Sequence, residues 1–160
     1  MLKINIFCVG TLKENYLKEA INEYKKRLSK YLILNIIEVK EAKIKSFDNE
    51  SLIKKTLDEE GERIIKLLKS EDYLILVDLH GKEETSEEFA NDLRKLKDYG
   101  KSSISFVIGG TLGLSDKLRK IANLRISLSK MTFPHQLTRV ILLEQIYRAF
   151  KIINNESYHH

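Results

Sequence analysis

The chain has 160 residues, with 28 Lys and Arg against 23 Asp and Glu, which gives a formal net charge of +5. This length fits one domain, and 42% hydrophobic residues are enough to bury a core, so composition excludes a disordered chain. No apolar run reaches the roughly 20 residues of a bilayer span, and no signal-peptide pattern is present, so we expect a cytoplasmic protein without a membrane segment. The single cysteine, Cys8, lies in an apolar run and is expected in the core. The modest basic excess allows an acidic partner such as nucleic acid without demonstrating one.

The first half of the chain predicts alternating strands and helices. Apolar runs predict strands over 2–9 and 32–39, and apolar residues spaced three and four apart predict a helix over 17–28 between them. A polar loop over 41–49 and a helix over 53–68 follow. Gly61 inside that helix costs about 1 kcal/mol relative to Ala. Either another element packs closely there or the glycine is simply tolerated, and we favour the second reading.

The second half continues the alternation. The apolar run 73–79 predicts a strand buried on both faces that ends at His80-Gly81-Lys82. Thr85 and Glu88 have the spacing of a capping box, which predicts the start of a helix whose buried face includes residues 89, 93 and 96.

A short strand over 105–108 ends at two glycines, and Ser115 is expected to cap the helix that follows it. That helix is expected to bury Leu118 and Ile121, and a last strand is predicted over 124–128. Pro134 fits the first turn of a final helix over 135–153, because a first turn does not need its missing N–H.

Five strands that alternate with five helices predict an α/β protein, residues 1–160 forming a single domain with a mostly parallel sheet and helices on both faces. Ligands of such sheets bind at the carboxyl ends of the strands. The loops that follow Val9, Val77, Ile108 and Leu128 are therefore the candidate ligand-binding segments.

The segment Gly109-Gly110-Thr111-Leu112-Gly113 follows a predicted strand and precedes a predicted helix. A ligand could approach its bare backbone, or the glycines could simply form a tight turn with positive φ. The spacing differs from G-x-G-x-x-G and no Walker loop is present, which argues against a dinucleotide or ATP site. The four histidines lack metal-binding spacing, so no metal is expected.

The final helix is apolar on most of its faces and must be buried on most of them. Two readings stay open. The helix either contacts a second subunit or forms part of the core of its own domain, with a charged stripe in solvent.

Several motifs together resemble one family. The main ones are Val107-Ile108-Gly109-Gly110, Gly113-Leu114-Ser115, the run from Leu128 to His135, Arg139-Val140, Glu144-Gln145-Ile146-Tyr147-Arg148-Ala149 and Tyr158-His159. The N-terminal half adds Val9-Gly10, Glu23-Tyr24, Arg27, Glu60-Gly61 and Gly81-Lys82. The chain resembles, over nearly its whole length, the bacterial SPOUT methyltransferases that modify N3 of a pseudouridine in 23S ribosomal RNA. One departure is His160, where other members tend to have a basic residue.

This resemblance implies properties that periodicity alone would not predict. It implies a homodimer, a deep trefoil knot in the C-terminal part of the sheet, S-adenosylmethionine as the methyl donor, and 23S ribosomal RNA in the ribosome as the partner. Knotted chains are almost absent among folds, so no pattern in the sequence points to one. The cofactor residues implied by position are Val77, Gly109, Leu128, Ser129, Lys130, Met131, Thr132 and Phe133.

The implied reaction needs a base or a positive charge, because N3 of a uracil ring carries a proton at neutral pH. His159 is the best candidate base, since an imidazole is largely neutral at pH 7. Tyr158 belongs to the same tail motif, and Arg139 could stabilise the uracil anion or hold a phosphate. His135 has either a structural or a catalytic role.

The basic residues near the first helix are expected to contact RNA phosphates, although a solvated helix face is the alternative. They are Lys13, Lys18, Lys25, Lys26 and Arg27. Two other functions remain open: a non-catalytic RNA- or ribosome-binding module, and a SPOUT methyltransferase that acts on another RNA nucleotide.

Overall fold

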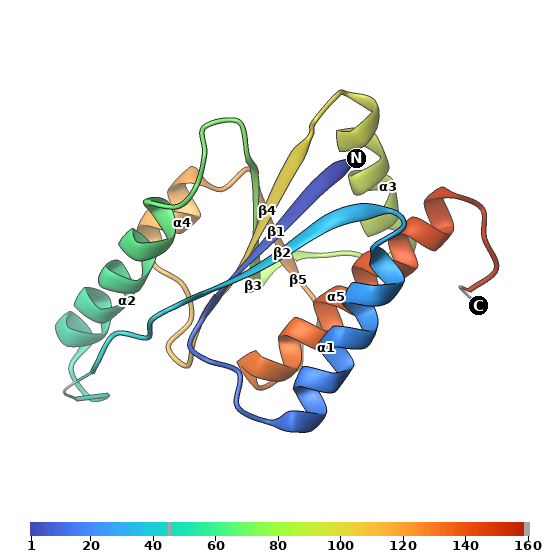
Figure 1. The fold of residues 1–160 in the computed structure, drawn as a ribbon. Helices are drawn as coiled ribbons and strands as arrows, with labels where there is room; N and C mark the ends of the chain where they lie inside the picture. The colour runs from blue at the N-terminus through green and yellow to red at the C-terminus, as the bar shows by residue number, and fades with distance from the viewer. Residues whose placement is uncertain (45, 159–160) are drawn as a thin grey trace.

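A computed structural model describes residues 1–44 and 46–158 of the chain. Five parallel strands form one twisted sheet in the order β2-β1-β4-β3-β5 (Figure 1). The strands are β1 (Leu2–Val9), β2 (Leu32–Val39), β3 (Tyr73–Glu83), β4 (Ser103–Ile108) and β5 (Leu124–Ser127). Because all five strands are parallel and β4, β3 and β5 are neighbours, the chain segments that leave β4 and β5 lie on the same side of the sheet as the carboxyl-terminal half of β3.

Helices cover both faces of the sheet, as predicted. On one face lie α1 (Asn15–Leu28), α3 (Ser86–Asp98) and α5 (His135–Ile153), and on the other α2 (Glu50–Ile65) and α4 (Asp116–Ile121) (Figure 1). The predicted α/β class with a parallel sheet is confirmed. No helix in the described part of the chain is long and apolar enough to cross a membrane.

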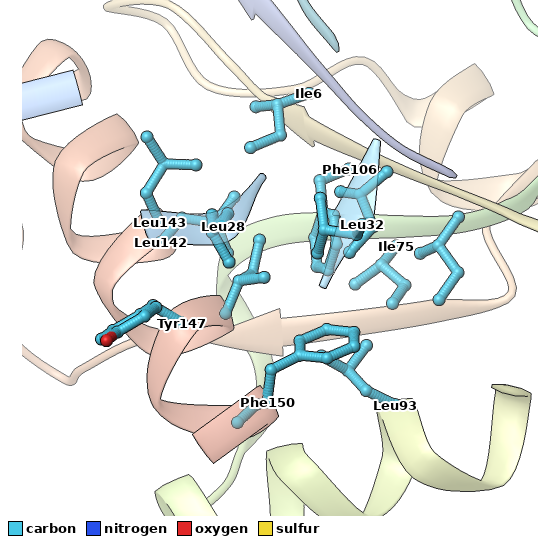
Figure 2. Packing of buried hydrophobic residues seen from close by; sticks show 14 of the residues in the cluster. Ile6, Leu28, Leu32, Ile75, Leu93, Phe106, Leu142, Leu143, Tyr147 and Phe150 are labelled. Carbon is cyan, nitrogen blue, oxygen red and sulfur yellow. The ribbon is translucent and has the colours of Figure 1, made fainter. Parts of the chain in front are cut away.

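Alternate residues of β1 supply two cores, one on each face of the sheet. Ile4, Ile6 and Cys8 belong to the larger core, which α5 closes with Leu142, Leu143 and Phe150, among others (Figure 2). Phe7 and Val9 belong to the smaller core on the side of α2 and α4. Burial raises the pKa of the Cys8 thiol to about 12, so Cys8 is a neutral core residue at pH 7, as expected from the sequence.

The prediction that β3 ends before His80 is wrong, because the strand continues to Glu83. The pairing of β3 with β5 shifts register between Val77 and Lys82, after which Lys82 pairs with Ile126. A Cβ at Gly81 would lie only 2.7 Å from the carbonyl carbon of Arg125, so the strands approach closely there. The polar residues of this extension hid it from a reading based on apolar runs.

The predicted helix starts at Thr85 and Ser115 are confirmed. The Thr85 hydroxyl accepts from the Glu88 N–H at 3.1 Å, and the Glu88 carboxylate accepts from the Thr85 N–H at 3.1 Å. Ser115 accepts from the Leu118 N–H at 3.2 Å. Ile121 was expected in the core but is 49% exposed, because α4 is a single short segment and only the face with Leu118 packs inward.

The structure contradicts our favoured interpretation that Gly61 is simply tolerated in its helix. A Cβ at this position would overlap Ser115 Oγ and lie 3.1 Å from Ser115 Cβ. The glycine therefore allows α2 to approach the N-terminus of α4. This helix begins and ends three residues earlier than predicted, at Glu50 and Ile65 rather than at 53 and 68.

Most of the apolar surface of α5 is buried within its own chain, which supports the core reading of this helix. Its buried residues are Thr138, Arg139, Leu142, Leu143, Ile146, Tyr147, Ala149 and Phe150. Leu137, Val140 and Ile141 stay partly exposed. A narrow apolar strip of α5 is therefore left partly exposed.

Candidate cofactor-binding site

The carboxyl ends of β4 and β5 and the irregular part of β3 beside them surround a cavity of about 380 Å³. Three chain segments line most of it. These are 77–80 in β3, where its pairing with β5 shifts register, 108–114 at and after the end of β4, and 127–133 at and after the end of β5 without Lys130, joined by Arg119 and Thr138. A cavity of this size fits a small molecule or cofactor.

Glycines shape the wall that follows β4. Gly113 has φ +96°, a conformation that favours glycine, and its N–H donates to the Gly110 carbonyl at 3.1 Å. A Cβ at Gly109 would overlap the carbonyl oxygen of Gly113 and lie 2.7 Å from its carbon. The 109–113 segment is thus a tight turn, as one reading of its sequence predicted, and it also lines the cavity, while contact with a ligand stays a prediction.

Two serine hydroxyls fix the wall that follows β5. Ser127 Oγ donates to the Ser129 carbonyl at 2.9 Å, and Ser129 Oγ accepts from the Met131 N–H at 2.9 Å. Met131 and Phe133 then expose apolar side chains beside the cavity. This wall offers apolar surface and backbone polar groups to a ligand.

A buried ion pair lies against the cavity where β3 meets α4. Asp78 is 5% exposed, and its Oδ2 accepts from Arg119 Nε at 2.9 Å. The His80 N–H donates to Asp78 Oδ1 at 3.1 Å, and Arg125 Nη1 lies 3.5 Å from Oδ2. Burial alone would raise the pKa of Asp78, but these hydrogen bonds and positive charges outweigh it and hold the pKa below its usual value. Asp78 is therefore ionised at neutral pH.

Arg139 lies outside this cavity. Its Nη1 donates to Glu38 Oε2 at 2.7 Å and its Nη2 to the Gly10 carbonyl at 3.0 Å, while only 3% of the side chain is exposed. The pKa of Glu38, which burial would raise, is lowered by the hydrogen bonds from Arg139 and from the Leu12 N–H. Arg139 lines a separate hollow of about 300 Å³ next to Lys18 and Lys25.

Tyr158 packs on the outer side of α5. Its hydroxyl donates to Glu144 Oε2 at 3.0 Å, and its ring meets Tyr147 edge-on with centroids 5.0 Å apart. Burial and the hydrogen bond to Glu144 raise the pKa of Tyr158, so its hydroxyl keeps its proton. His159 and His160 lie outside the described residues.

Comparison with known proteins identifies the family. A family model described as "Predicted SPOUT methyltransferase" matches residues 2–159. The ribosomal RNA large subunit methyltransferase H of Ruminiclostridium cellulolyticum is 52% identical, and that of Bacillus pumilus is 48% identical, each with 99% of both chains covered. The chain belongs to the SPOUT methyltransferase family.

A solved structure has a similar fold to this chain at low sequence identity. It is described as "a probable methylase family protein from Haemophilus influenzae Rd KW20", and it has a TM-score of 0.55 and 16% identity. The match covers 98% of this chain and 70% of the other.

The structure brings most of the implied cofactor residues of this SPOUT chain together. Lining the cavity are Val77, Gly109, Leu128, Ser129, Met131, Thr132 and Phe133. Lys130 belongs to the same loop without lining the cavity, and Arg139 and Tyr158 are not brought to it within the described chain. No group of three or more potential metal ligands occurs in residues 1–44 and 46–158.

Sequence reasoning missed Asp78 and Arg119. A signal for Asp78 was available, since a carboxylate in an otherwise buried strand needs a partner. No signal identified Arg119, because it is one of several charged residues in α4. Its buried partner, Asp78, is 41 positions away in the sequence.

Proposed function

We propose that this protein transfers a methyl group from S-adenosylmethionine to N3 of a pseudouridine in 23S ribosomal RNA. The observation that carries the proposal is 52% identity over the full chain to a ribosomal RNA large subunit methyltransferase H. The cavity at the strand ends supports it independently, since a methyl donor must be held where its reactive carbon can meet the RNA base.

The cavity fits such a donor in size and chemistry. Gly109 lines the cavity without a side chain, and its close contact with the Gly113 carbonyl fixes the shape of this wall. Leu128, Met131 and Phe133 offer apolar surface to an adenine ring, and the Ser127–Ser129 hydrogen bond keeps this wall in shape. When bound there, S-adenosylmethionine supplies an electrophilic methyl group on a sulfonium sulfur.

The target pseudouridine must lose its N3 proton before or during the attack of N3 on that methyl group. We assign proton removal to His159 and positioning of the target base to Tyr158. Arg139 would stabilise the uracil anion or hold a phosphate. Its guanidinium already binds Glu38 and Gly10, so contact with RNA requires it to share or exchange these partners.

We also propose a homodimer with a C-terminal trefoil knot. Tyr158 and Arg139 do not line the cavity of their own chain, so a second copy is needed to bring such groups to it. The partly exposed strip of Leu137, Val140 and Ile141 on α5 is apolar enough to join such an interface. Membership of the SPOUT family supports the knot.

The substrate surface is proposed to lie on α1. Lys25 and Lys26 are exposed in its last turn, where they can contact phosphates of the ribosome. We propose a cytoplasmic location, where ribosomes are available and the lone thiol of Cys8 stays reduced.

Two measurements test this function. Calorimetry with S-adenosylmethionine should show one site per chain, and the protein should transfer label from the donor to ribosomes. Nuclease digestion and mass spectrometry then identify the labelled nucleotide. A non-catalytic ribosome-binding module would bind ribosomes but would not bind S-adenosylmethionine. Label on another nucleotide would favour a SPOUT enzyme of different specificity.

A further inference from the structure

Among the described residues that line the 380 Å³ cavity, Asp78 is the only acidic residue and Arg119 the only Lys or Arg. All other lining residues in the described chain are apolar, glycine, hydroxyl-bearing or histidine. A charged part of a ligand must therefore meet this pair, because burial of an unpaired charge is costly.

The ion pair with Asp78 orients the guanidinium of Arg119 and leaves one of its nitrogen atoms available to a ligand. Arg119 Nε donates to Asp78 Oδ2 at 2.9 Å and Nη1 donates to Asp116 Oδ1 at 3.3 Å. These bonds leave Nη2 without a partner among the described residues. The side chain is 30% exposed, so Nη2 can donate hydrogen bonds to a ligand while Nε keeps its bond to Asp78.

The local charge favours an anion. Asp78 is buried and ionised, and it is offset by Arg119 and by Arg125 Nη1 at 3.5 Å. Arg125 does not line the cavity, and its contact with Asp78 offsets part of the charge of that carboxylate, so Arg119 is the positive group that a ligand in the cavity can meet. Asp116 has a side chain that is 69% exposed, so water screens most of its charge.

We propose that Arg119 binds the carboxylate of the methionyl part of the methyl donor, and that Asp78 positions Arg119 for this contact. This inference rests on the proposed function. A guanidinium matches a carboxylate in charge and in planar geometry, and the Asp78 contact at Nε fixes the plane. The apolar wall of Leu128 and Phe133 is then left for the uncharged adenine. Asp78 acts as a positioning residue rather than a contact to the donor.

The test compares two donors that differ only in this carboxylate. Binding of S-adenosylmethionine and of decarboxylated S-adenosylmethionine to full-length wild type and Arg119→Gln is measured by calorimetry. We expect Arg119→Gln to weaken S-adenosylmethionine by roughly 10- to 100-fold, the range for a hydrogen bond to a charged group, and the decarboxylated donor by less than about twofold. Equal losses for both donors, or no loss for either, would overturn the inference.

Two more variants separate this role from general damage. Lys120→Gln changes the next, exposed residue of α4 and should leave both affinities unchanged. Asp78→Asn, like Arg119→Gln, should weaken binding of S-adenosylmethionine more than binding of the decarboxylated donor. A purely structural loss would weaken binding of both donors alike.

The possible failures are distinguishable. If wild type binds neither donor, the proposed function itself fails. If wild type binds S-adenosylmethionine and Arg119→Gln binds it equally well but has a raised KM for ribosomes, Arg119 contacts RNA phosphate instead and only this inference fails.

Discussion

Gly109 lies where β4 ends and the cavity begins, and it has no space for even one more carbon atom. The missing Cβ would overlap the Gly113 carbonyl oxygen, so the turn can close only with glycine at this position. The sequence indicated the turn from its three glycines. It did not indicate that Gly109 matters through contact with Gly113 rather than through its own φ, since that contact depends on how the loop closes.

We expect Gly109→Ala to weaken binding of S-adenosylmethionine by roughly tenfold or more, because the strain of overpacking must move the cavity wall. Calorimetry measures the affinity. Gly100→Ala is the matched control. Its φ of +84° makes alanine unfavourable by roughly 1–2 kcal/mol, but it lies in the turn before β4, where nothing is within 4 Å of the added carbon. Equal affinities for the two variants would contradict this account of the turn.

Glu84 is a buried carboxyl group outside the cofactor cavity, and no sequence motif pointed to it. Its side chain is 4% exposed, and neither carboxylate oxygen has a hydrogen-bond partner in the described chain. Burial, with a smaller contribution from nearby Asp92, raises its pKa from 4.5 to about 7. Lys82 Nζ, 3.6 Å from Glu84 Oε1, does not offset this.

The raised pKa makes stability depend on pH. Between pH 4.5 and about 7 the unfolded chain has released a proton that the folded chain still holds, so the free energy of unfolding falls as pH rises through this window. Glu84→Gln replaces the ionisable carboxyl with a neutral amide of similar shape, and it should raise the free energy of unfolding at pH 8 by roughly 1–3 kcal/mol, with little change at pH 4.5. Urea denaturation at both pH values measures it. A gain of the same size at both would show that the charge of Glu84 is not the cause.

At the scale of elements, the sequence predicted features that depend on neighbouring residues, and it did not predict features that depend on contacts between distant segments. Thr85 with Glu88, and Ser115, marked helix starts correctly because a cap needs only neighbours in sequence. The extension of β3 to Glu83 depends on pairing with β5, some 40 residues away, so apolar periodicity could not reveal it. The role of Gly61 likewise depends on a different helix.

Gly61→Ala tests the contact between α2 and α4. Helix propensity alone favours alanine by about 1 kcal/mol, but the added Cβ would overlap Ser115 Oγ. We expect the clash to dominate and the free energy of unfolding to fall by roughly 1–3 kcal/mol. Lys55→Ala, at an exposed position of the same helix, should leave stability nearly unchanged. A stabilised Gly61→Ala variant would show that the two helices separate without cost.

At the scale of the whole molecule, the parallel α/β sheet followed from the order of strands and helices, and the cavity lies at the strand ends where such sheets bind ligands. The residues implied for the cofactor came from resemblance, and all except Lys130 line that cavity. Arg139 and Tyr158 lie elsewhere in the described chain, so sequence position alone did not predict how they would reach a substrate.

Charge reversal on α1 tests the proposed RNA surface. Arg27 is already engaged with Glu23 and the rings of Tyr24 and Tyr147, so the informative variant is Lys25→Glu with Lys26→Glu. We expect weaker binding to ribosomes and a log–log salt slope smaller by roughly 0.7–0.9 for each lost phosphate contact. Lys54→Glu with Lys55→Glu makes the same charge change on α2, across the sheet, and should have little effect. Identical slopes for both variants would remove α1 from the RNA surface.

The central claim is that this chain methylates N3 of a pseudouridine in 23S ribosomal RNA. Mass spectrometry of 23S ribosomal RNA from a strain without the gene tests it most directly, with the wild-type strain and a strain that regains the gene as references. We predict that one methyl group, on one pseudouridine, is absent from the deletion strain and returns with the gene. Its presence in the deletion strain, or the loss of methylation at a different nucleotide, would contradict the account.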